Sequence, residues 1–301
     1  MNNPESSYTI EKAAEKKERE PNNDVPIIDV VRHGKTDYKE LNDASFKFDP
    51  DAPDFLLDSE HLDLTEAGIQ DVKRSAEQIV SSIEPDKEAV VLITSPNYRA
   101  QSSILLIEQV LKQKGITILN SSTTGEGEQV AEIKKSNSLK QFTMRDDELQ
   151  TDWVEAHFNY HKKNPDDRAS TTIAQRHKVM AASIGKEVAD IFTKDHGQMG
   201  EEFKRWLRHM ININAYLQLD TKSVLEGKRM RIIAVTHEER VDDFAKQALG
   251  PDTRVYPAQV LEINPDKKLV RGHSTYASVS LFGADVGMRK EGEIVFRFDK
   301  K

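Results

Sequence analysis

Residues 25–36 read VPIIDVVRHGKT, and this stretch decides how the rest of the chain is interpreted. The apolar run at 25–31 is typical of a buried strand, and Arg32, His33 and Gly34 follow where that strand would end. In open α/β sheets, ligands bind beyond the carboxyl ends of the strands. Arginine offers a planar set of donors for phosphate oxygens, histidine can act as a nucleophile, and glycine lets the backbone approach a ligand closely. The stretch therefore predicts a phosphate site with its own nucleophile.

Two later segments have the same form, a strand-like run followed by a cation or an imidazole. Residues 90–94, VVLIT, form one such run, and the Ser-Pro pair after them favours a helix whose first turn carries Arg99. Residues 231–236, RIIAVT, form another, and His237 follows it directly. Because the carboxyl ends of parallel strands share one edge of a sheet, Arg99 and His237 are expected to lie beside the residues that end the first strand.

These motifs, in this order, resemble the histidine phosphatase superfamily, which is also called phosphoglycerate mutase-like. The matching pieces are RHG at 32–34, LTEAG at 64–68, SPNYRA at 95–100 and VTH at 235–237. The resemblance implies an α/β fold, a three-layer α/β/α sandwich around a mostly parallel mixed sheet. The chain carries Arg-His-Gly without the Arg-x-Pro extension of the acid phosphatase and phytase branch. It also lacks the aromatic-Asn pair of the sugar-phosphate mutases.

The resemblance also implies a role for each matching side chain. His33 would attack phosphorus and form a phosphohistidine, while its second ring nitrogen donates a proton to a backbone carbonyl. His237 would hydrogen-bond the phosphoryl oxygens as they gain charge. The residues expected to hold the substrate phosphate are Arg32, Arg99, Thr36 and Gly34. For Thr36, a local role in a turn or helix cap is the alternative.

A general acid is also required, because the leaving alkoxide must be protonated. The segment RDDELQTDW at 145–153 is the best source, since the resembled family carries its acid ahead of an aromatic residue. Glu148 is the first choice. Asp147 remains close behind it, because its spacing to Trp153 fits almost as well. The competing interpretation is an ordinary solvated acidic turn.

One feature departs from the family pattern. Glu238 and Glu239 follow His237 directly. A carboxylate beside a phosphate dianion repels it unless the carboxylate points away or meets a cation. Hydrolysis of a phosphomonoester, without a metal, is the first interpretation. A phosphomutase of the phosphoglycerate mutase type and a catalytically weak phosphate-binding member are the alternatives.

The composition narrows the function classes further. The chain has 301 residues, of which 31% are charged, with a net charge of −8 and no cysteine. The charge predicts no nucleic-acid or membrane partner, and the absence of cysteine excludes disulfides and thiol catalysis and fits a cytoplasmic location. His157 and His161 have helical spacing but lack the Glu of a zinc-protease pattern, so no metal and no cofactor are expected. A small phosphorylated molecule is the expected substrate, and the oligomeric state is open.

The chain is expected to divide into a tail and one domain. Residues 1–24 have almost no large apolar groups and predict a disordered tail, whereas residues 25–301 form the domain. An insertion at about 120–225 is expected to cap the site. Helices are predicted at 65–83, 99–114, 172–193 and 201–219, strands at 116–119, 258–263, 277–282 and 293–298, and a loop with one helical turn at 121–138.

Overall fold

The computed structural model describes most of the domain and a short piece of the tail. Described are residues 10–12, 25–36, 64–119, 121–123, 129–131, 133–146, 149–164, 171–220, 228–284 and 289–297. Within residues 1–24, the predicted tail, only Ile10–Lys12 are described, and they form strand β1 at one edge of the main sheet. No described helix is both long and apolar enough to cross a membrane.

The domain is built on a mixed sheet with the strand order β1-β10-β9-β8-β2-β7-β3-β6. Strand β2 pairs in parallel with β7, which pairs in parallel with β3, whereas β8 runs antiparallel to β2. With the remaining pairings, β8 and β10 run antiparallel to the other six strands of this sheet, which all run in one direction. The strands are β2 (Ile27–Arg32), β3 (Glu88–Thr94), β6 (Lys134–Lys135), β7 (Arg229–Thr236), β8 (Gln259–Pro265), β9 (Ser274–Gly283) and β10 (Lys290–Arg297).

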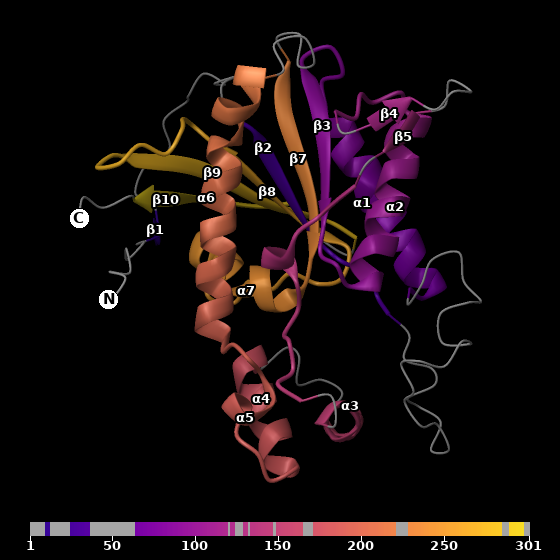
Figure 1. The fold of residues 1–301 in the computed structure, drawn as a ribbon, viewed down its shortest axis with the longest axis vertical. Helices are drawn as coiled ribbons and strands as arrows, with labels where there is room; N and C mark the ends of the chain where they lie inside the picture. Colours follow the sequence, from indigo (N-terminus) through magenta and orange to yellow (C-terminus); the bar gives the residue numbers. More distant parts are fainter. Residues whose placement is uncertain are drawn as a thin grey trace.

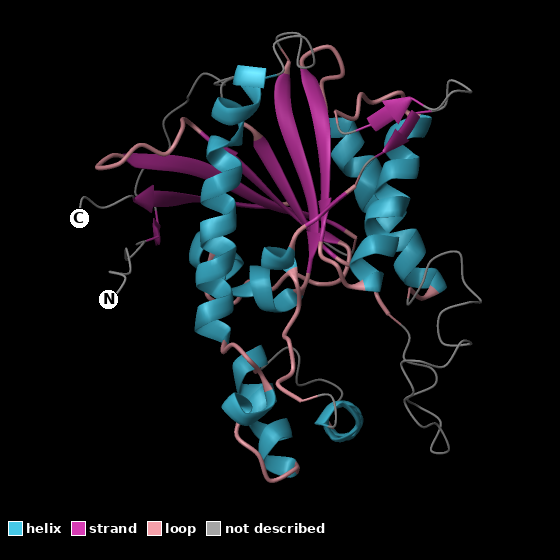
Figure 2. Cartoon of the chain, viewed as in Figure 1, coloured by secondary structure: helices cyan, strands magenta, loops and turns pink. Residues whose placement is uncertain are grey.

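Helices cover both faces of this sheet (Figures 1 and 2). Helices α1 (Glu66–Ser82) and α2 (Tyr98–Gln113) pack on one face, and α6 (His196–Asp220) and α7 (Glu238–Leu249) pack on the other. Neighbouring strand residues point to opposite faces, so Val30 contributes to the core under α6 and α7, and Val31 to the core under α1 and α2. The expected α/β fold with three layers and a mostly parallel mixed sheet is confirmed.

The prediction of one continuous helix over 172–193 is wrong, because two separate helices occupy this range. Helix α4 (Ile173–Ser183) begins with a capping box between Thr172 and Gln175. It ends before Gly185, which has a φ of 68°, a left-handed conformation that favours glycine. The short helix α5 (Val188–Ile191) follows. A local glycine conformation therefore overrides the continuous helical pattern.

Three further segments differ from the sequence-based expectations. The predicted strand 116–119 makes a single bridge, between Val90 and Ile118. The predicted loop 121–138 contains the ribbon of β4 (Ser121–Thr123) and β5 (Gln129–Ala131), strand β6 and the 3-10 turn η3 (Asn137–Leu139). Helix α3 (Leu149–Lys163), which was not predicted, follows the acidic segment. Helices α3, α4 and α5 lie together beyond one end of the sheet (Figure 1).

Candidate active site

Strands β2, β3 and β7 are parallel, so their carboxyl ends lie at the same end of the sheet. The ladder continues past the strands, because the His33 N–H donates to the Thr236 carbonyl at 3.0 Å and the Ser95 N–H donates to Val235 at 2.9 Å. This backbone pairing brings together residues from three distant parts of the sequence. The rings of His33 and His237 consequently lie with their centroids 5.0 Å apart, at 58° to one another.

The turn after β2 holds His33 from two sides. The Gly34 N–H donates to Ser103 Oγ at 3.0 Å, and a Cβ on Gly34 would lie only 2.8 Å from Val72 Cγ2. On the other side, the N–H of Ala258, whose φ is 62°, donates to the carbonyl of His33 at 3.2 Å. Gly34 therefore serves the close packing of the turn against α1 and α2, and its N–H is already bonded within the protein.

The hydrogen bonding of His33 fixes its tautomer. His33 Nδ1 lies 2.8 Å from the Gly34 carbonyl, which can only accept, so Nδ1 carries the proton and Nε2 carries the lone pair. Burial, followed by the positive charges of Arg99 and Arg32, lowers the pKa of His33 well below 6.5. The ring is therefore neutral at neutral pH, with a nucleophilic Nε2. The contact with a backbone carbonyl is the one that the sequence predicted.

His237 is also buried, and it is oriented by the turn after β3. Ser95 Oγ donates its hydrogen bond to Asn97 Oδ1 at 2.9 Å, so it accepts a hydrogen bond from the protonated Nε2 of His237 at 2.9 Å. His237 Nδ1 is buried and has no hydrogen-bond partner within the described part of the chain. Burial, then His33, Arg99 and Arg32, lowers the pKa of His237. A bound anion would raise the pKa of His237 and so favour a proton on Nδ1, which would then act as a donor.

Arg32 is held on one side of its guanidinium. Its Nη1 donates to the Val255 carbonyl at 2.7 Å, and its Nη2 forms an ion pair with Glu238 Oε2 at 2.7 Å. Asp242 fixes the same loop by accepting the Val255 N–H at 3.1 Å. The Nε–H of Arg32 is buried, and no acceptor for it exists among the described residues. Arg32 therefore keeps a buried donor close to His33.

Arg99 enters the site from the first turn of α2. Its Nη2 donates to Gln141 Oε1, and Gln141 Nε2 donates in turn to Glu239 Oε1 at 3.1 Å. The Gln141 N–H is fixed by Asn97 Oδ1 at 3.3 Å. One of the two carboxylates that depart from the family pattern is thus linked to Arg99 through an amide.

Arg176, from α4, is a site residue that the sequence analysis missed. Its side chain is 4% exposed, and its Nη2 pairs with Glu238 Oε1 at 2.7 Å. Glu238 therefore shares its two oxygens between Arg176 and Arg32, which are cations of the chain itself. The sequence does contain a signal that Arg176 is buried, because Arg176 and His177 fall on the helical stripe that includes Ile173 and Met180. A cation on such a stripe is buried and must meet a partner.

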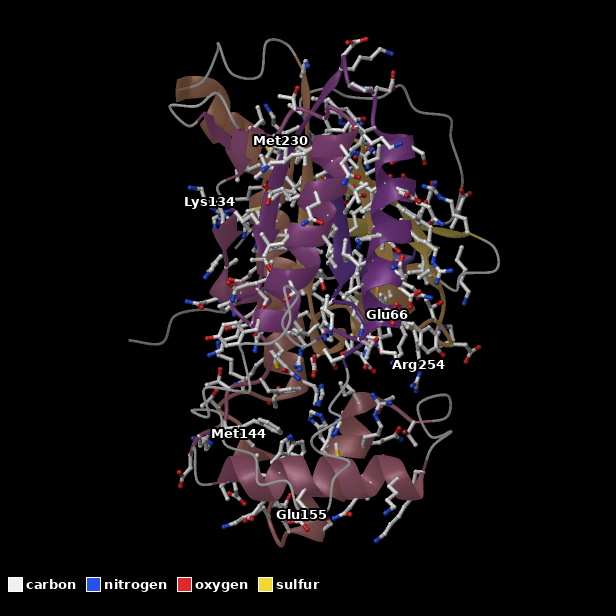
Figure 3. All side chains as sticks on the ribbon, turned by 90° about the vertical axis from the view of Figure 1, so that its right-hand side faces the viewer. Glu66, Lys134, Met144, Glu155, Met230 and Arg254 are labelled. Atoms are coloured by element: carbon white, nitrogen blue, oxygen red, sulfur yellow. The ribbon has the colours of Figure 1, made fainter. Side chains whose placement is uncertain are left out.

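A cluster of rings lies next to this ion pair, in the part formed by α3, α4 and α5. His177 and His196 have centroids 5.1 Å apart, and both contact the ring of Phe142. The pKa of His196 is lowered to about 4 and that of His177 well below 6.5; burial is the largest cause of both shifts, and the Arg176 charge contributes to both. Figure 3 shows this part below the main body, with Met144 labelled.

Several expected residues make no contribution that the structure describes. Glu148 and Asp147, the two choices for the general acid, lie outside the described residues. Thr36 is half-buried and forms a single bridge to Leu64, just before α1, and its contact with phosphate stays a prediction. Across the described ranges, no three His, Asp or Glu side chains gather as a metal site.

Comparisons with known proteins find similarity only among solved structures. No protein-family model matches the chain, and no curated protein matches its sequence. The open reading frame Rv3214 product of Mycobacterium tuberculosis is 12% identical over 89% of this chain and 95% of that chain, with a TM-score of 0.35. A Hafnia alvei phytase, in complex with myo-inositol hexakis sulphate, is 10% identical over 90% of each chain, with a TM-score of 0.33. A D. castellii phytase is 12% identical over 92% of this chain and 77% of that chain, with a TM-score of 0.31. At these values the similarity carries no argument about activity.

Proposed function

We propose that this chain is a phosphomonoester hydrolase of the histidine phosphatase superfamily, acting without a metal through a phosphohistidine on His33. The observation that carries the proposal is the state of His33, a buried neutral imidazole whose Nδ1 donates to Gly34 and whose Nε2 is unprotonated. The charges of Arg32 and Arg99 both act on this ring. A nucleophile in a cationic environment suits a substrate that brings a dianion.

The reaction would proceed in two displacements. His33 Nε2 attacks phosphorus in line, the ester P–O bond breaks, and the leaving alkoxide takes a proton from a general acid. Arg32, Arg99 and a protonated His237 would stabilise the equatorial oxygens. The acid, now a carboxylate, then removes a proton from water, which attacks the phosphohistidine and releases inorganic phosphate. Glu148 is proposed for this carboxylate.

Glu238 supports one alternative, a catalytically weak phosphate-binding member. Its carboxylate already binds Arg32 and Arg176, so a phosphate must compete with it for Arg32 or bind through the Nε–H. A small phosphorylated molecule remains the proposed substrate in either case. A phosphomutase would use the same nucleophile but return the phosphoryl group to an isomer.

The experiment is a hydrolysis screen over sugar phosphates, nucleotides and phosphopeptides, with chelator present throughout. We expect inorganic phosphate release by the wild type and by His273→Asn, a matched control at an exposed histidine, and none by His33→Asn. Equal release by His33→Asn, or release that requires added metal, would contradict the proposal. An isomer formed without phosphate release would favour the mutase, and binding of phosphate without turnover would favour the weak member.

A further inference from the structure

A large cavity lies away from the histidine pair, between α6 and the sheet edge formed by β3 and β6. Its volume is about 740 Å³, which is in the range of small-molecule sites. Its lining includes Met230 of β7 and Lys134 of β6, and none of the site residues described above. Figure 3 shows both labels on the upper part of the molecule, far from α3. The cavity is therefore a separate feature of the fold.

The inner surface of the cavity is apolar. Ile93 and Met230 form buried parts of it, on the same face of the sheet as the core under α6. Val91 of β3 and Met210 and Ile213 of α6 also line it but are only partly buried. These side chains keep exposed apolar surface between α6 and the edge of the sheet. An alkyl chain would remove that surface from water.

The rim of the cavity is cationic. Lys134 and Lys135 border it from β6, and Arg205 borders it from α6. The acid in the lining, Glu202, directs one oxygen to Lys194 and the other to Arg240 at 3.0 Å, so its charge is balanced by these partners. The whole chain carries a net charge of −8, so a positive rim is a local feature rather than a property of the surface.

We propose that this cavity binds the anion of a fatty acid with a chain of about twelve carbons. The alkyl chain would lie along Val91, Met230 and Ile213, and the carboxylate would lie at the rim between Lys135 and Arg205, both of which are exposed. One charged group and one apolar chain match the two kinds of surface in the lining. The proposal does not depend on the hydrolase activity, because it uses none of the residues near His33.

The test measures binding of dodecanoate to the full chain by isothermal titration, below the concentration at which dodecanoate forms micelles. Dodecyltrimethylammonium has the same chain with the opposite charge, and acetate has the charge without the chain. We expect one dodecanoate per chain, bound at least tenfold more tightly than either comparison compound. Binding no tighter than that of the ammonium compound would overturn the proposal, since the charge of the rim would then select nothing.

Two variants and a matched control locate the site. Arg205→Glu reverses a rim charge and Ile213→Trp fills the apolar part, and each is expected to weaken dodecanoate binding at least tenfold. Lys178→Glu, at an exposed lysine on α4, which lies beyond the end of the sheet away from the cavity (Figure 1), should leave binding within twofold of the wild type. Unchanged binding in both site variants would contradict the proposal. A dimer that Arg205→Glu dissociates, with no dodecanoate binding, would instead make the cavity an interface between copies.

Discussion

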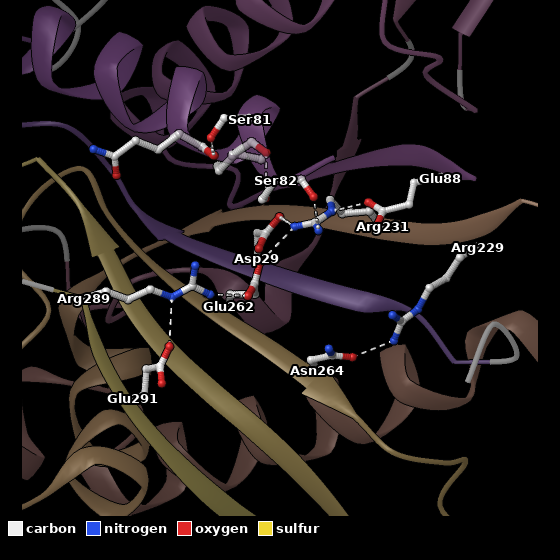
Figure 4. A network of polar contacts seen from close by, with 12 residues as sticks. Asp29, Ser81, Ser82, Glu88, Arg229, Arg231, Glu262, Asn264, Arg289 and Glu291 are labelled. Atoms are coloured by element: carbon white, nitrogen blue, oxygen red, sulfur yellow. Dashed lines mark hydrogen bonds and ion pairs between the residues drawn. The ribbon is translucent and has the colours of Figure 1, made fainter. Parts of the chain in front are cut away.

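The same strands carry two buried polar clusters at opposite ends, and the two clusters differ in how their hydrogen bonds are satisfied. Near the start of the strands, Arg231 of β7 binds three carboxylates in a closed ion network (Figure 4). At the carboxyl ends, Arg32, His33 and His237 form the candidate site. Both clusters combine a buried arginine with buried titratable groups, so burial alone does not distinguish a functional cluster from a structural one.

In the Arg231 network, every part of the guanidinium has an acceptor. Nη1 binds Asp29 at 2.9 Å and Glu262 at 3.2 Å, Nε binds Glu88 at 2.7 Å, and Nη2 donates to the Ser82 carbonyl at 3.3 Å. Burial raises the pKa of Asp29 to about 6, although Arg231 opposes this shift. Such a network holds the strands together and binds every nitrogen of the Arg231 side chain, although Asp29 Oδ1 is buried without a hydrogen-bond partner among the described residues.

The candidate site is different, because nitrogens of its arginine and its histidine, rather than a carboxylate oxygen, lack hydrogen-bond partners. Arg32 Nε and His237 Nδ1 are buried without a hydrogen-bond partner within the described residues. Leaving a buried polar group unsatisfied costs about 1–3 kcal/mol. The Arg231 network, the closed cluster, therefore serves stability. The open cluster of Arg32, His33 and His237 is suited to a ligand anion.

The largest expected effect lies in the closed cluster. Arg231→Met leaves Asp29, Glu88 and Glu262 without their shared cation, and breaking a buried ion pair in this way costs about 3–5 kcal/mol. We expect the free energy of unfolding, measured by urea denaturation, to fall by that amount. The turnover per folded molecule should stay within twofold of the wild type. A variant with wild-type stability would show that the network is not structural.

The next effect lies in the open cluster. Arg32→Lys keeps a positive charge but removes the planar guanidinium, so kcat/KM is expected to fall roughly 10²-fold, or about 2.7 kcal/mol. The free energy of unfolding should change far less than in Arg231→Met. Steady-state kinetics and urea denaturation of the same preparation measure both quantities. Loss of stability without loss of kcat/KM would reverse the roles of the two clusters.

The pH dependence of stability should have opposite signs in two regions. The pKa of His196 falls from 6.5 to about 4 on folding, so its contribution is present above pH 6.5 and is lost as the pH falls toward 4. The pKa of Asp29 rises from 3.8 to about 6, so its contribution is present below pH 3.8 and is lost as the pH rises toward 6. Each amounts to about 3 kcal/mol over its window.

Two variants separate these contributions. Between pH 4 and 6, the stability of His196→Asn should rise less steeply with pH than that of the wild type. The stability of Asp29→Asn should rise more steeply. Urea denaturation at several pH values measures these slopes, and two variants with the wild-type slope would contradict both assignments.

The smallest effect concerns the link between α4 and the site. Arg176→Gln removes an arginine that binds Glu238, so this carboxylate should compete more strongly with phosphate for Arg32. We expect KM to rise about tenfold, or 1.4 kcal/mol, with kcat nearly unchanged. Lys178→Gln, an exposed neighbour on α4, is the control. A fall in kcat at constant KM would show that Arg176 acts in the chemical step instead.

Much of the fold could be predicted because its determinants are local in sequence. Apolar runs and the residues that follow them identified β2, β3 and β7, and the spacing of apolar residues identified α1 and α2. The break at Gly185 was missed because helical spacing continues through it, although the chain adopts a left-handed conformation there. The sequence pattern describes periodicity and gives no direct account of such a conformation.

The candidate site was predictable only in part, for a related reason. Arg32, His33 and His237 follow strands that meet at one edge, so parallel pairing alone brings them together. Arg176 and Glu238 are 62 positions apart in the sequence, and no local pattern specifies the packing that brings them into contact. The role of Glu148 stays a prediction, since it lies outside the described residues.

The central claim is that the open cluster serves transfer of a phosphoryl group to His33. Rapid acid-free quenching after mixing with a substrate labelled in its phosphoryl group, followed by peptide mapping, tests it most directly. We predict an acid-labile label on the peptide that carries His33, and no label on His33→Asn. A substrate that is turned over while label never reaches His33, or label that persists in His33→Asn, would contradict the account.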